Sequence, residues 1–340
     1  MKRERQPGRI FLRVVLHLAV LFALGACSPA SEAATTVSAQ PEDGPWVMPS
    51  RALCAASYAV VPSESGRMSS DVLAEVSGLV ASPAQPGVLW AHNDSGDAAR
   101  IYGIDERANL LAIVDLAGIE AIDFEDIAAA ACPDGSGPCI WVADVGDNRE
   151  IRDDAVVYAV PEPSLDEIEN VGTPLQLSVA EGWRFPVVYP GGAVNVEALV
   201  VRPDGSEFYL FEKSDSIQAR LFRTPSPLVD DVPLALENIL TIESPGVDVE
   251  HGRKITGADL HPSGQALLVR VYTGVFEFAL DNVDDLQRLH HKTPAMVALG
   301  PFAEPQGEAI AYDDSGLGIW TMSEDPEGRG LQPLHFLACQ

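Results

Sequence analysis

The chain has 340 residues, and its 50 aspartates and glutamates outnumber 22 lysines and arginines, for a formal net charge of −28 at pH 7. Such an acidic surface repels nucleic acids and anionic lipid headgroups unless a cation intervenes, so we expect no nucleic-acid partner. The negative charge has two interpretations: it serves solubility alone, or the protein binds divalent cations.

The N-terminal residues have the pattern of an export signal. Four basic residues precede an apolar stretch over 11–23, which ends in Leu24-Gly25-Ala26-Cys27. This ending resembles a bacterial lipobox and predicts a lipoprotein signal peptide over 1–26, with palmitate and the other lipid chains on Cys27. The alternatives are an ordinary signal peptide cut nearby or an uncleaved anchor. We therefore expect an extracytoplasmic protein, lipid-anchored to a bacterial membrane.

The region after the signal divides into two parts. Residues 27–52 are rich in Ser, Ala, Thr, Pro and Glu and lack apolar periodicity, which predicts a flexible tether. Residues 53–340 suffice for one large all-β domain, which we expect to be a monomer. No segment after the signal approaches the about 20 apolar residues that a membrane-spanning helix needs.

Four cysteines remain when Cys27 is assigned to the lipid. Cys132 and Cys139 border a turn-rich loop whose ends can meet, which predicts a local disulfide. The other pair, Cys54 and Cys339, then joins the two ends of the folded part. Zinc is the competing use of four cysteines, but no C-x-x-C spacing is present.

The periodicity of the domain is of the β kind, with short apolar runs between clusters of Gly, Pro, Asp and Asn. The runs form groups of four: 76–82, 87–92, 100–105 and 110–116; 125–131, 139–145, 155–160 and 175–180; 197–201, 207–212, 219–224 and 239–243; 256–261, 266–272, 275–279 and 296–299. The last group, 308–312, 318–322 and 333–337, lacks one strand, which Ser57–Val61 can supply. The sequence predicts a β-propeller of five four-stranded blades closed by this N-terminal strand, or of six blades if 162–192 holds another.

One oxygen-bearing residue stands at the same level of the first strand in every blade. When these strands are aligned on their turns, the residues are Ser77, Glu125, Glu197, Thr256 and Glu308. First strands line the channel of a propeller, and three carboxylates at one level could not stay ionised together without a cation. Hard oxygen ligands suit Ca²⁺, so we predict a central calcium site; the alternative is a set of hydrated strand starts.

The chain resembles the calcium-activated nucleotidases (apyrases), five-bladed propellers whose central Ca²⁺ is held by a Ser/Glu/Glu/Ser/Glu ring. Here Glu75-Val76-Ser77-Gly78-Leu79 matches the E-x-S-x-L motif of that family, and the four later ring residues match in order, with threonine for one serine. The chain also resembles bacterial secreted propellers with HNDSG and GDN motifs. The nucleotidases carry two acids and an arginine in the first-blade loop, where this chain has Asn93-Asp94-Ser95.

Polar residues gather where the second strands return to the face at which the ring begins. The candidate ligand-binding residues are His92, Asn93, Asp94, Asp144, Asn148, Arg149, Lys213, Arg270, Tyr272 and Glu324. Asn and Asp are common in turns for backbone reasons. In so acidic a protein, however, Lys213 and Arg270 indicate a cradle for an anionic group.

Two functions remain open from the sequence. The first is a lipid-anchored propeller with a central calcium that binds a small anionic ligand or a protein partner on its top face. The second is a calcium-dependent hydrolase of phosphoester or nucleotide substrates. No G-x-S-x-G, H-E-x-x-H or P-loop is present, so a hydrolase would activate water with a carboxylate beside the metal, Asp94 or Asp144. The sequence does not decide whether the protein is an enzyme.

Overall fold

The computed structural model describes residues 54, 63–68, 71–166, 173–180, 182–298, 304, 306–324 and 333–339. The chain divides into two units, Met1–Val47 and Met48–Gln340, and every described residue belongs to the second. The predicted signal peptide and the whole of the predicted tether therefore lie outside the described residues. Within the described part, no helix has the length and apolar character needed to cross a membrane.

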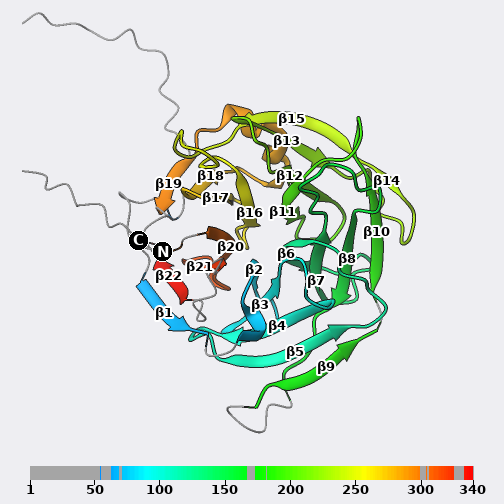
Figure 1. Cartoon of the computed structure of the whole chain (residues 1–340), viewed down its shortest axis with the longest axis vertical. Coiled ribbons are helices and arrows are strands. Elements are labelled where there is room, and N and C mark those ends of the chain that lie inside the picture. The colour runs from blue at the N-terminus through cyan, green and yellow to red at the C-terminus, as the bar shows by residue number, and fades with distance from the viewer. Residues whose placement is uncertain are drawn as a thin grey trace, which may run out of the picture. The chain divides into compact units, whose positions relative to one another are not determined.

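The second unit is an all-β propeller of five four-stranded blades (Figure 1). Blade one contains β2 (Val76–Ala81), β3 (Val88–Asn93), β4 (Arg100–Asp105) and β5 (Leu110–Leu116). Blade two contains β6 (Phe124–Ala131), β7 (Pro138–Asp144), β8 (Val156–Pro161) and β10 (Trp183–Val188). Blade three contains β11 (Val196–Val201), β12 (Phe208–Glu212), β13 (Gln218–Arg223) and β15 (Glu237–Glu243). Blade four contains β16 (Ile255–Leu260), β17 (Ala266–Val271), β18 (Gly274–Ala279) and β19 (Ala295–Ala298). Blade five contains β20 (Gln306–Tyr312), β21 (Gly318–Glu324), β22 (Pro333–Ala338) and β1 (Ser63–Arg67).

The two inner strands of each blade are mostly apolar because both faces of each blade are covered there. Among the described residues, five buried apolar clusters form, and each is filled by two neighbouring blades. Between blades two and three, for example, Trp141 stacks on Phe185 with 5.6 Å between ring centroids and also packs against Phe208. Burying one such side chain contributes about 2 kcal/mol. The core thus consists of the interfaces between blades, and these fix the first strands around the channel.

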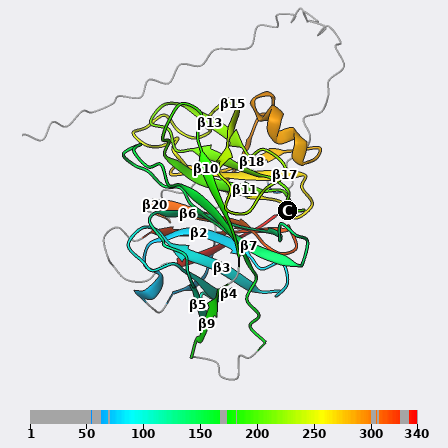
Figure 2. The same cartoon turned by 90° about the vertical axis from the view of Figure 1, so that its right-hand side faces the viewer.

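Two 3₁₀ helices accompany the strands of the described part. They are η1 (Asp71–Leu73), which precedes β2, and η2 (Val283–His291), which begins at the N-cap Asn282. Figure 2 shows η2 in orange outside the sheets, where it packs beside β15.

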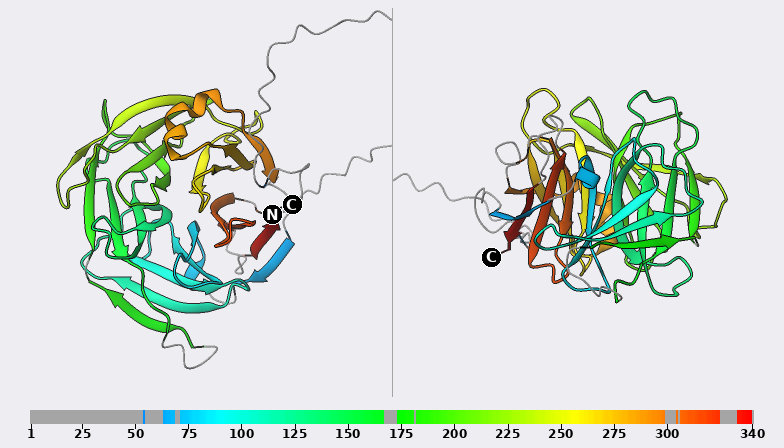
Figure 3. Two further views of the ribbon diagram at one scale, coloured as in Figure 1. Left: turned by 180° about the vertical axis from the view of Figure 1, so that it is seen from behind. Right: turned by 60° about the horizontal axis from the view of Figure 1, so that its bottom comes forward.

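The closure of the ring follows the prediction. β1 pairs antiparallel with β22, and Figure 3 shows these two strands side by side. The disulfides Cys54–Cys339 and Cys132–Cys139 are both present. The closing strand is Ser63–Arg67, whereas the predicted segment 57–61 lies outside the described residues.

The assignment of 175–180 to blade two was wrong. β9 (Leu175–Val179) pairs in parallel with β5 at the outer edge of blade one, and β10 takes the fourth place of blade two. The reason lies in packing: β9 is half-buried and covers blade one with Leu175 and Leu177, whereas β10 places Phe185 in the core. The stretch 162–192 therefore extends two blades instead of adding a sixth. A second short strand, β14 (Leu234–Ala235), pairs in parallel with β10.

Candidate metal centre

A β-bulge interrupts the first strand of every blade at the same level. Pairing with the second strand skips one residue in four blades and two residues in blade five. The skipped residues are Ser77, Glu125, Glu197, Thr256, and Glu308 with Ala309. A bulge re-aims the side chain of its extra residue, so each predicted ring residue leaves the regular alternation of its strand. This is how a glutamate can stand at the start of a buried strand.

All five ring residues are buried, with exposed fractions of 3% or less. The two hydroxyl members join neighbouring blades: Ser77 Oγ donates to the Glu125 carbonyl oxygen at 2.7 Å. In the same way, Thr256 Oγ1 donates to the carbonyl oxygen of Gly307 at 2.9 Å. The hydroxyl groups therefore hold adjacent bulges in register, and the three glutamates supply the negative charge.

Lys213 supplies a positive charge among these glutamates. Its Nζ lies 2.8 Å from Glu197 Oε2, and it stands 5.2 Å from the centroid of the Tyr272 ring. Although burial disfavours the charged ammonium, the carboxylates of Glu197 and Glu308 raise the pKa of Lys213 well above its usual range. One internal ion pair thus occupies part of the ring.

One ammonium does not balance the carboxylates at this end of the channel. Burial, with Glu197 and Asp94 adding to it, raises the pKa of Glu125 well above its usual range. Burial likewise raises the pKa of Glu308, and its Oε2 atom is buried without a hydrogen-bond partner among the described residues. These carboxyl groups must therefore take up protons or a further cation.

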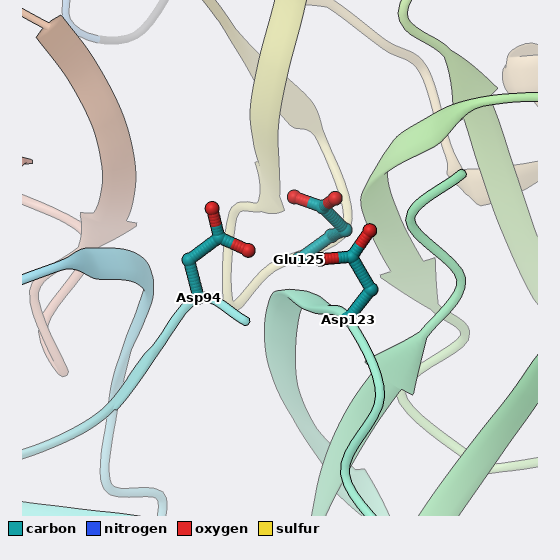
Figure 4. Close-up of side chains that lie close together, drawn as sticks. All are labelled: Asp94, Asp123 and Glu125. Carbon is teal, nitrogen blue, oxygen red and sulfur yellow. The ribbon is translucent and has the colours of Figure 1, made fainter. Parts of the chain in front are cut away.

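Three carboxylates lie close enough to share one cation. Asp94 follows β3, Asp123 precedes β6 and Glu125 is the bulge residue of β6; Figure 4 shows their side chains converging. One oxygen of each lies within 4.8 Å of the other two. Calcium ligands lie at about 2.3–2.6 Å from the ion, so oxygens on one ion are separated by up to about 5 Å. Burial and the neighbouring Asp94 raise the pKa of Asp123 to about 7.

Gly146, in the Gly146-Asp147-Asn148 motif, makes room for this group. A Cβ atom at this position would overlap Glu125 Oε1 and come within 2.5 Å of Asp123 Oδ2. The φ angle of Gly146 does not lie in the left-handed region, so space is the reason for the glycine and not conformation. The motif therefore places bare backbone against the carboxylates.

Asp144 holds the loop that carries Asp123. Its Oδ1 accepts the Asp123 N–H at 2.9 Å and pairs with Arg152 Nη2 at 2.9 Å, while its Oδ2 accepts the Ile122 N–H. The side chain is buried and committed to these bonds. Asp144 is therefore placed to position Asp123, and Asp94 is the candidate base that stays partly exposed.

The other predicted residues divide into three groups. Asp94, Lys213, Tyr272 and Glu324 lie around the ring, and burial with Asp94 nearby raises the pKa of Glu324 to about 7. Asn148 and Arg149 are exposed on the loop after β7. By contrast, His92, Asn93 and Arg270 are engaged in internal contacts.

Those internal contacts are specific. His92 is fully buried with its ring edge against Phe124, and Asn93 Nδ2 donates to Val72 O and Asp97 Oδ2. Arg270 is fully buried, forms an ion pair with Glu304 and donates to Ala309 O. The structure does not bring this guanidinium to the face on which an anionic group was expected.

Asp123 and Glu304 were missed by the sequence reasoning. Asp123 carried a usable signal, because it stands two residues before the ring glutamate of blade two and shares its acidic stretch. Glu304 carried none, since its partner Arg270 is 34 residues away.

The comparisons with known proteins give no family. No protein-family model matches the chain, and no curated protein matches it. Among solved structures, a chain of the mitotic checkpoint complex is similar at 11% identity and a TM-score of 0.34, over 77% of this chain and 63% of that one. Hydrazine synthase of Kuenenia stuttgartiensis is similar at 12% identity and a TM-score of 0.37, over 84% of this chain and 99% of that one. This chain thus spans less than two thirds of the first of these structures.

Proposed function

We propose that the protein is an extracytoplasmic, lipid-anchored propeller that binds Ca²⁺ at the acidic end of its channel and there holds an anionic ligand or a protein partner. The observation that carries the proposal is the convergence of Asp94, Asp123 and Glu125 within 4.8 Å. The buried, unpartnered Oε2 of Glu308 supports it independently. The lipobox-like sequence before Cys27 supports the anchor.

Calcium is the cation that best suits these ligands. The three carboxylates offer only hard oxygen atoms, and Ca²⁺ accepts six to eight such ligands in flexible geometry. Asp94, Asp123 and Glu125 would supply only part of this coordination shell. The open positions would let a phosphate or carboxylate group of a ligand join the ion, and the exposed Arg149 would add charge complementarity.

A calcium-dependent hydrolase of phosphoester or nucleotide substrates is the second candidate function. Its support is the partial exposure of Asp94 and Asp123, because water held by the cation would lie within their reach. The engagement of Asp144 with Arg152 and two backbone N–H groups weighs against Asp144 as the base. Binding without turnover is therefore our first choice.

Metal binding can be tested by thermal unfolding, because a ligand that binds only the folded state stabilises it by mass action. Chelation should lower the melting temperature of the purified protein, and added Ca²⁺ should restore it. Glu125→Gln, Glu197→Gln and Glu308→Gln should each weaken this response. Glu212→Gln is the matched control, since Glu212 is not a bulge residue and its carboxylate pairs with Arg220. If chelator leaves the melting temperature unchanged and no metal co-purifies with the protein, the proposed metal site is refuted.

Two further experiments separate the functions and test the anchor. A panel of phosphoesters and nucleotides, assayed with and without Ca²⁺, should show no turnover if the protein only binds. Calcium-dependent turnover that Asp94→Asn abolishes would instead establish the hydrolase. Cys27→Ser should stop incorporation of radiolabelled palmitate and release the protein from membranes; unchanged labelling would exclude Cys27 as the lipid site.

A further inference from the structure

A cavity of about 570 Å³ opens at the other end of the channel, where the first strands end. The ends of β2, β6, β11, β16 and β20 and the turns after them all contribute to its wall. The cavity thus lies at the opposite end of these strands from the ring of bulges. Its volume falls within the range of about 300–1,000 Å³ that is typical of small-molecule sites.

The wall of the cavity is mostly aliphatic. Alanine, valine, leucine and proline side chains of the first strands and their turns make up most of it, with Ala131 at the end of β6 partly exposed to it. The rim includes Gly135 and Gly137 of the short loop that the Cys132–Cys139 disulfide closes. A covalently closed loop keeps the mouth of the cavity in shape.

The charges on this wall have one sign. Asp259, Asp313 and Asp314 line the cavity, and no lysine or arginine is among the described residues that do. His261 also lines it, but both ring nitrogens are engaged, at 2.7 Å with Ser263 Oγ and at 3.0 Å with Gly316 O. An anionic ligand would therefore meet carboxylates with no compensating cation.

Of the three aspartates that line the cavity, Asp259 is the one that lies within a first strand, β16, and not in a turn after it. Its Oδ2 accepts the Tyr312 N–H at 2.7 Å, which ties blade four to blade five, yet the residue stays partly exposed. Burial raises the pKa of Asp259 to about 7. Burial makes the charged form of this carboxylate costly, and a cation placed beside it would remove that cost.

We propose that this cavity binds an organic cation with an apolar body, its cationic group beside Asp259 and its apolar part against the aliphatic wall. The volume suits a molecule of drug-like size, the wall suits an alkyl or aryl body, and the charge selects against anions. A neutral apolar ligand would leave the Asp259 carboxylate desolvated and unpaired, so it should bind more weakly. The site shares no residue with the metal centre and stands independently of the proposed calcium binding.

Titration calorimetry with three octyl probes below their micellar concentrations tests the proposal: octyltrimethylammonium, octyl glucoside and octyl sulfate. The mature protein should bind the ammonium probe about tenfold more tightly than the glucoside and should not bind the sulfate measurably. Asp259→Asn, which keeps an acceptor for the Tyr312 N–H, should weaken the ammonium probe about tenfold and leave the glucoside unchanged. Ala131→Trp should fill the cavity and abolish binding of both.

The acidic surface could attract cations without a site, so a matched control is needed. Asp134→Asn removes the same charge from the disulfide loop at a residue that does not line the cavity, and it should leave every affinity within about twofold. The proposal is overturned if the wild-type protein binds none of the probes, or binds all three alike. It is equally overturned if Asp134→Asn weakens the ammonium probe as much as Asp259→Asn, or if Ala131→Trp, shown to be folded by its melting curve, still binds it.

Discussion

The ammonium nitrogen of Lys213 lies 2.8 Å from Glu197 Oε2, inside the ring of bulge residues. An ion pair as buried as this one costs about 3–5 kcal/mol when one partner is removed, because the other charge is left uncompensated. Lys213 therefore provides, from within the chain, part of the positive charge that the glutamates of the ring require. Any metal ion at this end of the channel would therefore share the neutralisation of the ring glutamates with Lys213.

Lys213→Met should make the fold more dependent on calcium. The substitution keeps an unbranched side chain, shorter by one atom, and removes its charge, so without Ca²⁺ the variant should lose about 3 kcal/mol of unfolding free energy. Added Ca²⁺ should recover more stability in the variant than in the wild type, as read from melting curves with and without chelator. Lys254→Met, at a lysine paired with the exposed Asp215, is the control and should change neither value. An unchanged calcium response in Lys213→Met would separate Lys213 from the metal centre.

Gly146→Ala should damage the metal centre without unfolding the blade. The added methyl group would displace Glu125 and Asp123, so the rise in melting temperature on adding Ca²⁺ should shrink by at least half. Gly103→Ala is the control, since its Cβ would crowd Trp90 in blade one at 3.1 Å, away from the acids. That variant should lose stability and keep its calcium response. A full calcium response in Gly146→Ala would mean that the carboxylates do not hold the ion together.

Glu304 should make the fold sensitive to acid. Burial alone would raise its pKa, but the charge of Arg270, with hydrogen bonds from His335 and Thr321, lowers the pKa to about 2. Because the folded pKa lies below the unfolded value, this stabilisation is complete above about pH 4.5 and is lost as the pH falls toward 2. The difference corresponds to about 3 kcal/mol.

Glu304→Gln should remove that acid dependence. Circular dichroism of the variant should show lower stability at pH 7, by about 3 kcal/mol, and a flatter loss of stability between pH 4.5 and 2. Glu243→Gln, at an exposed partner of Arg253, should keep the wild-type profile. Parallel acid profiles of wild type and Glu304→Gln would show that this carboxyl is not the group responsible.

The Cys54–Cys339 disulfide should stabilise the ring far more than Cys132–Cys139 does. The first bond closes a loop with a sequence separation of 285 residues and the second one of 7. In the chain-entropy model this difference favours the long loop by more than 2 kcal/mol. Cys339→Ser should accordingly lower the melting temperature more than Cys132→Ser. Free thiols at Cys54 and Cys339 in peptide maps of non-reduced protein from an oxidising compartment would contradict the pairing.

Most strands could be predicted because each blade packs on two neighbours, which makes its strands short apolar runs between turn residues. The ring residues could be aligned for a related reason, since every first strand starts at the same end of the channel. What failed was the assignment of Leu175–Val179, because a strand in an outer edge position has the same pattern whichever blade it joins. Lys213 and Arg270 also could not be distinguished, because only the distant Glu304 determines that Arg270 is buried.

Three strands, the parallel edge strands β9 and β14 and the closing strand β1, pair with a blade other than the one next to them in sequence. β9 leaves blade two to join blade one, β14 leaves blade three to join blade two, and β1 crosses from the start of the chain to blade five. Among the described strands, blade four neither gives nor receives one. A duplicated blade one would leave the outer edge of one copy without β9, so blade number is constrained on that side of the ring. Because the Cα atoms of Cys54 and Cys339 lie 4.4 Å apart, a short linker could join the propeller domain at these two residues. A circular permutant opened between β15 and β16 would then keep both chain connections of every exchanged strand, whereas one opened between β8 and β9 would cut one of the two connections that tie β9 to blade two.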